Sequence, residues 1–378
     1  MFVANCHPSP VYRIVDIKYP MSIQPEKLIM NIAYVTANKL NVRRQPEVAA
    51  GNIMGTLGMG DKVENIVDAY NPGWALVTCR AAWTTSGRTV RRGYVSKQHL
   101  RSDVVITTSG RRYVTATSLN VRSEPRVSAS SKIGTLRMAA PVEFLEKTSV
   151  SDLVLVECEA SWTTAGPKRR RCYVSNKYLR GPARASVEAL VQSAYQEWQR
   201  FGFGTGLEHV SPFYRYVGEM WSAINQRLNG KDKDVPWSAA AISFMVRKVK
   251  DNYSGFKYST AHWTYLNDAI SDKINNRAGP FWGYRITDKK PEVGDIVGKW
   301  RKSRITYDSA YAKSKRSSAN DQAYASHSDI VVAVTGSIAY ALGGNVGDSV
   351  NLTRYPLDRK GYLANRGNVF VLLKNKAR

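Results

Sequence analysis

The sequence predicts a multidomain chain in which two copies of a small all-β module precede a separate α+β domain. Three observations support this prediction. The 378 residues exceed the usual size of one domain. A segment of 68 residues recurs without gaps at an offset of 79, with 32 identical positions. Beyond the second copy, long amphipathic patterns come first and short apolar runs follow, an order that favours an α+β domain.

Each repeat has the pattern of a small antiparallel barrel. The first begins with YVTANKLNVRRQP at Tyr34 and the second with YVTATSLNVRSEP at Tyr113. Short runs rich in Val, Leu and Ile are broken by Pro, Gly and Ser about every ten residues, without a long helical pattern between them. The motifs L-N-V-R-x-x-P, G-T-L and Y-V-S-x-x-x-L resemble those of bacterial SH3 domains attached to cell-wall hydrolases. This resemblance implies SH3-like barrels that bind peptidoglycan or its peptides.

A basic segment follows the shared tryptophan in each repeat. A net charge of +25 over the whole chain favours polyanionic partners, although charge alone names none. These segments are either solvated hairpin tips or a patch that binds wall polymers or other anions. The candidate binding residues are Arg88, Arg91, Arg92, Lys168, Arg169, Arg170 and Arg171. The tryptophans Trp83 and Trp162 are expected in the barrel cores, with sugar stacking as the alternative.

The four cysteines, Cys6, Cys79, Cys158 and Cys172, lack the close paired spacing of a zinc site or redox motif. We therefore expect structural thiols, no metal and no cofactor. No apolar run is long enough for a transmembrane helix, and the first twenty residues lack the pattern of a signal peptide.

From Ala183 the sequence predicts amphipathic helices, and after Arg285 it predicts strands. The segment VPWSAAAISFMV places Ser238 at or beside the start of a helix, and PEVGDIV, HSDIVVAV and GGNV follow in that order. This series resembles papain-like NlpC-type peptidases and CHAP amidases. It more closely resembles an uncharacterised bacterial family related to them, with W-S-A-A-x-I-S, Y-S-x-x-H, H-x-D-I-V and G-G-N-V.

The resemblance implies a papain-like hydrolase with serine in place of the usual cysteine. Ser238 matches the nucleophile, His327 the base and Asn345 the residue that orients the imidazole, as in Cys-His-Asn triads. Each has an ordinary alternative: a helix cap for Ser238, a core histidine for His327 and a left-handed turn for Asn345. The expected substrate-cleft residues are Trp237, His262, Ser259 and Asp348.

The expected division is an N-terminal extension over residues 1–33, SH3-like domains over 34–103 and 111–182, and the hydrolase-like domain over 184–378. The leading functional hypothesis is a peptidoglycan amidase or endopeptidase held on the wall by its repeats, as in phage lysins and interbacterial toxins. Its expected partners are peptidoglycan or another anionic envelope polymer, and an immunity protein, without a specific nucleic acid. Delivery to the envelope or periplasm by a non-Sec route is expected. The alternatives are a wall- or polyanion-binding protein with a degenerate peptidase domain, and a serine esterase or acyltransferase.

Overall fold

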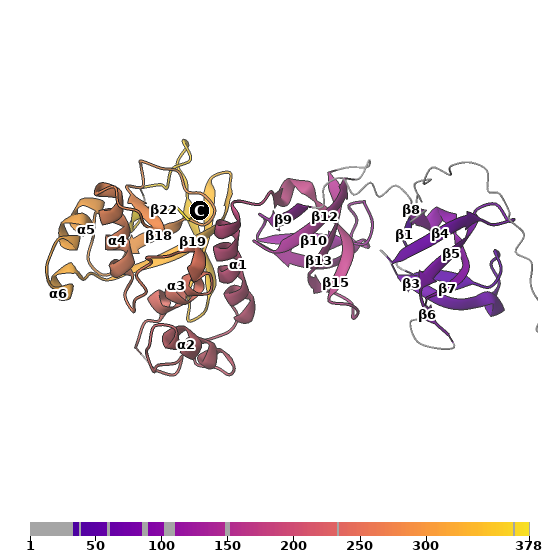
Figure 1. Cartoon of the computed structure of the whole chain (residues 1–378), viewed down its shortest axis with the longest axis horizontal. Helices are drawn as coiled ribbons and strands as arrows, with labels where there is room; N and C mark the ends of the chain where they lie inside the picture. The colour runs from indigo at the N-terminus through magenta and orange to yellow at the C-terminus, as the bar shows by residue number, and fades with distance from the viewer. Residues whose placement is uncertain are drawn as a thin grey trace, which may run out of the picture. The chain divides into compact units, whose positions relative to one another are not determined.

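The computed structural model describes residues 33–37, 39–58, 61–84, 90–101, 110–147, 152–232, 234–365 and 367–377. The expected N-terminal extension, Cys6 and Arg88 therefore lie outside the described residues, apart from Ala33. The chain divides into two compact units. One holds the first repeat, and the other holds the second repeat together with the C-terminal region (Figure 1).

The first repeat forms an antiparallel sheet with the strand order β6-β3-β2-β7-β5-β4-β1-β8. Inward and outward residues alternate along its strands, as in β5, where Ala75, Val77 and Cys79 are buried. In the residues described, no pairing joins the edge strands β6 and β8, so the sheet is not shown to close into a barrel. Its strands are β1 (Ala33–Val35), β2 (Lys39–Arg43), β3 (Ile53–Gly58), β4 (Lys62–Asp68), β5 (Trp74–Arg80), β6 (Ala82–Trp83), β7 (Val90–Ser96) and β8 (Leu100–Arg101).

The second repeat reproduces this topology strand for strand, in the order β14-β11-β10-β15-β13-β12-β9-β16. The gapless repetition in the sequence is therefore matched by the same pairing pattern. The strands are β9 (Gly110–Val114), β10 (Ser118–Arg122), β11 (Lys132–Arg137), β12 (Pro141–Lys147), β13 (Leu153–Glu159), β14 (Ser161–Trp162), β15 (Arg169–Ser175) and β16 (Leu179–Arg180).

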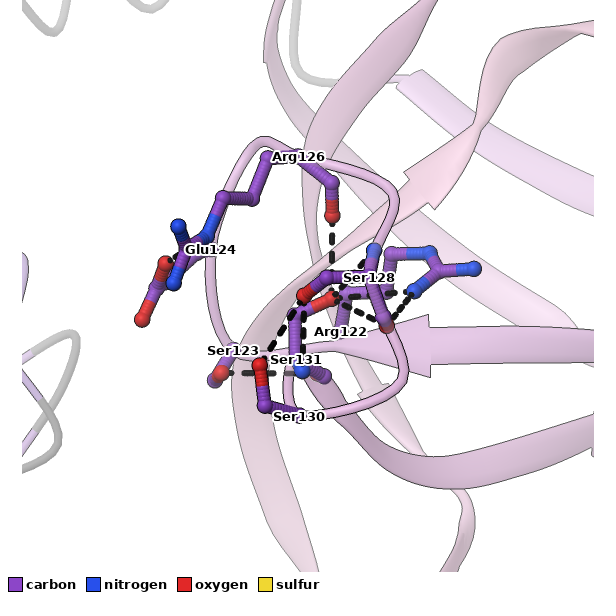
Figure 2. A network of polar contacts seen from close by, with 7 residues as sticks. All are labelled: Arg122, Ser123, Glu124, Arg126, Ser128, Ser130 and Ser131. Atoms are coloured by element: carbon purple, nitrogen blue, oxygen red, sulfur yellow. Dashed lines mark hydrogen bonds and ion pairs between the residues drawn. The ribbon is translucent and has the colours of Figure 1, made fainter.

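An arginine at the end of a strand closes the following loop in both repeats. In the second repeat, Arg122 Nη1 donates to Ser128 O at 2.7 Å and to Ser131 Oγ at 2.9 Å (Figure 2). At the equivalent place in the first repeat, Arg43 Nη1 donates to Ala49 O at 2.7 Å. The position of Ser131 is taken there by Asn52, whose side chain also bonds to the loop backbone. Different polar side chains thus bond to the backbone of the equivalent loop in the two repeats.

The C-terminal region begins with helices and continues with a six-stranded antiparallel sheet in the order β17-β22-β18-β19-β20-β21. The predicted order of helices before strands holds for α1 to α4, but β17 precedes Arg285, and α5 and α6 lie between β18 and β19. The helices are α1 (Ala185–Arg200), α2 (Phe213–Ser222), α3 (Ser238–Arg247), α4 (His262–Ile274), α5 (Tyr307–Ser314) and α6 (Ala319–Gln322). The strands are β17 (Phe281–Tyr284), β18 (Ile296–Trp300), β19 (Ser326–Thr335), β20 (Ile338–Gly343), β21 (Asn351–Pro356) and β22 (Val369–Asn375).

Both faces of this sheet are covered. Ile330 and Val332 of β19 belong to the main core, with α1, α3 and α4 packed on that side (Figure 1). Val331, between them, belongs to a second cluster that includes Val297 and Leu372. Alternation along β19 therefore sends neighbouring side chains to opposite faces.

The second repeat shares the main hydrophobic core with the C-terminal region. The core cluster joins Leu136 and Cys158 of the repeat to Tyr195 and Trp198 of α1. Gln192 Nε2 on the same helix donates to Ala139 O at 3.0 Å. Helix α1 thus buries apolar side chains against both parts, so they form one unit. In the part of the chain that is described, no helix is long and apolar enough to cross a membrane.

Candidate functional site

Ser238 is the first residue of α3, which confirms the predicted helix start. The residue in the N-cap position is Trp237, and no side chain caps the helix. The Ser238 hydroxyl instead lies 2.7 Å from His262 Nε2. Ser238 is 7% exposed, so this contact is largely screened from solvent. The interaction is that of a hydroxyl with an adjacent base rather than that of a helix cap.

His262 begins α4 and is buried. Its Nδ1 lies 2.9 Å from Ser328 Oγ and also within hydrogen-bond distance of the Tyr265 hydroxyl. These two hydroxyls are 2.9 Å apart. If Nδ1 carries the proton and donates it to this pair, Nε2 is left to accept the hydroxyl proton of Ser238. The hydroxyl pair is therefore compatible with the tautomer that a base for Ser238 needs, since either hydroxyl can accept from Nδ1–H.

The imidazole of His262 is held in its neutral form. Burial lowers its pKa well below 6.5, and the nearby His327, Arg301 and Lys299 lower it further, whereas Asp329 opposes them. A neutral imidazole is the form that can accept a proton. Asp329 is the carboxylate that acts against this lowering and favours the imidazolium formed when His262 takes a proton.

His327 is paired with a buried carboxylate. Its Nε2 lies 2.9 Å from Asp329 Oδ1, and Lys299 Nζ lies 3.4 Å from Asp329 Oδ2. The Tyr355 hydroxyl also donates to Oδ2. Burial by itself raises the pKa of Asp329, but His327, Lys299 and Tyr355 together hold that pKa below its usual range. Asp329 is therefore a stable anion that orients His327.

The structure corrects the predicted pairing: His262, not His327, contacts Ser238, and Asp329, not Asn345, is bonded to His327. Alternation along β19 gives the reason. Ser328 points to the face that carries α3 and α4, whereas His327 and Asp329 point to the other face with Tyr355. The rings of His262 and His327 still approach to 5.1 Å between centroids.

The G-G-N-V motif packs against the His327–Asp329 pair and against helix α3. A Cβ on Gly343 would lie 1.8 Å from Asp329 Oδ1 and 3.4 Å from His327 Nε2. A Cβ on Gly344 would lie 2.3 Å from Ala241 Cβ in α3. Asn345 adopts a left-handed backbone with φ of 54°, as its turn interpretation requires. Among the described residues, no hydrogen bond joins its side chain to either histidine.

A cleft of about 720 Å³ opens beside these groups. Ser238, His262, His327 and Asn345 all line it. The other lining residues are Pro236, Thr260, Ala261, Trp263, Arg301, Lys302, Ala323, Tyr324, Ala325 and Ser326. The first intrahelical hydrogen bond of α3 is donated by Ala241 N, so the three preceding N–H groups are available at the Ser238 end. Such donors can stabilise an oxyanion.

Three residues expected at the cleft are placed elsewhere. Trp237 is 1% exposed, stacks on Phe201 and donates from Nε1 to Glu208. Ser259 Oγ accepts from Ala261 N at 3.1 Å ahead of α4. Asp348 is exposed with φ of 56°, and its carbonyl accepts from Glu208 N. None of the three lines the cleft, so they support the walls or the loops instead.

Asp295, the aspartate of PEVGDIV, binds two residues of the last strand, β22. Asp295 is buried, with Lys374 Nζ 2.6 Å from Oδ2 and Asn375 N donating to Oδ1 at 2.9 Å. Burial raises its pKa to about 6, although Lys374 opposes the shift. This motif member therefore holds β22 beside β18 rather than taking part in the cleft.

The basic residues of the repeats are partly engaged in contacts within the protein. Arg170 stacks 4.6 Å from the centroid of Trp162 and donates to Thr164 O at 2.8 Å. The equivalent Arg91 lies 5.4 Å from the centroid of Trp83. Arg169 forms an ion pair with Glu157 at 3.5 Å. Arg92 is exposed and Arg171 half-buried on the corresponding strands, and Lys168 is exposed just before β15.

The three cysteines among the described residues are buried free thiols. Cys158 and Cys172 are buried with their Sγ atoms 3.4 Å apart, and Cys79 is buried in the first repeat. Burial raises the pKa of Cys79 to about 12. Within the residues described, no cluster of His, Cys, Asp and Glu has a metal-binding arrangement.

Sequence reasoning missed Asp329, Ser328 and Tyr265. The sequence contains a signal for two of these three residues. Asp329 lies two residues after His327 on a strand, so both point to the same face. Tyr265 lies three residues after His262 on a helix, where side chains are neighbours. Ser328 has no such signal, because only the packing of α4 on β19 brings it to His262.

Comparison with known proteins gives one family and several structures. Residues 194–375, slightly less than half of the chain, match the model of a family described as "Uncharacterized protein conserved in bacteria (DUF2272)". None of the curated proteins matches the chain. Similar solved structures include two NlpC proteins and one NlpC/P60 family protein.

They include NlpC2 from Trichomonas vaginalis, with 12% identity, a TM-score of 0.22 and coverage of 90% of this chain and 97% of that one. NlpC1 from the same organism has 12% identity, a TM-score of 0.22 and coverage of 94% and 99%. An NlpC/P60 family protein from Bacillus cereus has 9% identity, a TM-score of 0.21 and coverage of 90% and 98%. Similarity at this level carries no weight for the function, which we infer from the geometry of the site.

Proposed function

We propose that this protein is a cell-wall hydrolase that cleaves amide bonds in the stem peptides of peptidoglycan, with Ser238 as its nucleophile. The observation that carries the proposal is the 2.7 Å contact between Ser238 Oγ and His262 Nε2 at the start of α3, beside an open cleft. A serine hydroxyl is a weak nucleophile at neutral pH, and it needs an adjacent base to take its proton. The papain-like fold and the SH3-like nature of the repeats belong to this proposal.

In the proposed reaction, Ser238 Oγ attacks the amide carbonyl carbon while His262 Nε2 takes the hydroxyl proton. The N–H groups at the start of α3 stabilise the oxyanion. His262 then gives the proton to the leaving amine as the C–N bond breaks, which leaves an ester on Ser238. Water, deprotonated by His262, attacks this ester, and the proton returns to Ser238 as the carboxylic acid product leaves.

His327 and Asp329 have a supporting role in this proposal. Their pair lies beside His262, with the two imidazole centroids 5.1 Å apart. The charge of Asp329 favours a protonated His262, which must form during the reaction. We assign Asn345 to the cleft wall, where its side chain is available to the substrate.

The function is tested by incubating the full-length protein with purified peptidoglycan and analysing the released fragments by mass spectrometry. We expect fragments with new amino and carboxyl ends within the stem peptides. Removal of ester-linked acyl groups alone would favour the esterase alternative. Binding without any covalent change would favour the degenerate-peptidase alternative.

The repeats are proposed to hold the protein on the wall at the cell envelope. Removing residues 1–102 takes away one compact unit, so we expect weaker co-sedimentation with peptidoglycan and unchanged cleavage of a small soluble peptide. Cutting at residue 183 should instead destabilise the enzyme, because Tyr195 and Trp198 of α1 belong to a core shared with the second repeat. Equal loss of binding and cleavage on removal of residues 1–102 would contradict a targeting role.

A further inference from the structure

The cleft beside Ser238 is lined by positive charge without a compensating carboxylate. Its lining residues include Arg301 and Lys302 but no Asp or Glu. Both cations follow directly after strand β18, in the segment that leads to α5. A cleft lined by charge of one sign attracts ligands of the opposite sign.

The backbone of this segment is anchored, although the charged side chains are exposed. Arg301 N donates to Ala325 O at 2.8 Å, which joins the cation-bearing segment to the segment ahead of β19. Among the described residues, no hydrogen bond or ion pair engages the Arg301 guanidinium or the Lys302 ammonium group. The charge of Arg301 nevertheless acts at the catalytic group, because it lowers the pKa of the buried His262.

Aromatic residues complete this part of the cleft. Trp263 and Tyr324 are half-buried lining residues, and the Tyr324 hydroxyl donates to Asn267 Oδ1 at 2.9 Å. With its hydroxyl engaged, Tyr324 is fixed as a wall of the cleft. Trp263 and Tyr324 thus place apolar surface beside the two exposed cations, where a ligand in the cleft can contact both.

We propose that the cleft selects acyl substrates that carry a free carboxylate close to the scissile amide, with Arg301 and Lys302 as the carboxylate-binding residues. This inference rests on the proposed function, and it names the substrate class of the same site. The planar guanidinium of Arg301 can bind a carboxylate through two parallel hydrogen bonds. Lys302 supplies a second charge. A stem peptide with free α-carboxylates satisfies this requirement, whereas the same peptide with amidated carboxyl groups does not.

The test is a binding measurement on the full-length protein with Ser238→Ala, so that no substrate is consumed. The probes are synthetic L-Ala-γ-D-Glu-L-Lys-D-Ala and its fully amidated counterpart, measured by calorimetry. We expect the free acid to bind at least about 10-fold more tightly than the amide, the size of effect of one or two charge-assisted hydrogen bonds. Adding Arg301→Gln and Lys302→Gln should remove this preference and leave the affinity for the amide unchanged.

Arg304→Gln, added to Ser238→Ala, is the matched control, because Arg304 is an exposed arginine of the same segment that does not line the cleft. It should retain the preference. Equal affinity for the two probes, no binding of either probe, or equal loss of preference with Arg304→Gln would overturn the proposal. The wild-type protein could fail to cleave any substrate while the preference for the free-acid probe persists. In that case the carboxylate site stands and only the hydrolase function is lost.

Discussion

Replacing Ser238 with Ala should lower kcat for amide cleavage by about 10⁴-fold or more while the domain stays folded. The reason is that Ser238 forms the covalent bond in the proposed reaction, so its loss removes the reaction path. The loss of stability should stay at about 1–3 kcal/mol, because no helix cap is removed but the buried His262 Nε2 loses its hydroxyl partner. Thermal unfolding and fragment release, measured on the same preparation, separate the two effects.

The matched control is Ser243→Ala on the same helix. Ser243 Oγ donates to Ser259 O and accepts from Ser259 N, both at 3.1 Å, and the side chain is fully buried. Its loss should destabilise the domain by about 1 kcal/mol or more, because the N–H and C=O of the half-buried Ser259 lose their partner. Turnover per folded molecule should not change. Full activity in folded Ser238→Ala would end the serine-hydrolase proposal.

Replacing His262 with Gln should reduce kcat nearly as far as Ser238→Ala, because His262 is the group that accepts the Ser238 proton. Replacing His327 with Gln should leave measurable activity, since His327 contacts Asp329 rather than Ser238. The double variant Ser238→Ala with His262→Gln should be no less active than Ser238→Ala alone, as expected for groups that act as one unit. Kinetics on a soluble stem peptide provide the measurement.

The pH dependence of activity tests whether a neutral His262 is required. Activity requires neutral His262, whose pKa lies well below 6.5, so kcat/KM should be flat above pH 6.5 and should fall only on further acidification. In Asp329→Asn the carboxylate that opposes the lowering is lost, so the pKa of His262 falls and the acid limb should move to still lower pH. Complete inactivity of His327→Gln beside an active His262→Gln would assign the base to His327 instead, and an unchanged acid limb in Asp329→Asn would show that Asp329 does not act on the base.

The local pattern of residues was enough to predict the secondary structure that frames the site. The gapless repeat from Tyr34 and Tyr113 required two modules of equal topology, and the strand orders of the two sheets agree. The start of α3 at Ser238 also followed from sequence, because an apolar helical period begins immediately after VPW. These features depend on residues that are close together in the chain.

The identity of the groups that meet at the site depended on the tertiary structure. Ser238 and His262 begin two different helices, and only the packing of α3 and α4 on the same face of the sheet brings their side chains to 2.7 Å. His327 lies on β19 of the same sheet, but alternation along this strand gives its Nε2 a different partner, Asp329 Oδ1. Which residues of a strand face a helix is settled by register and packing over long sequence separations, and motif order alone does not specify it.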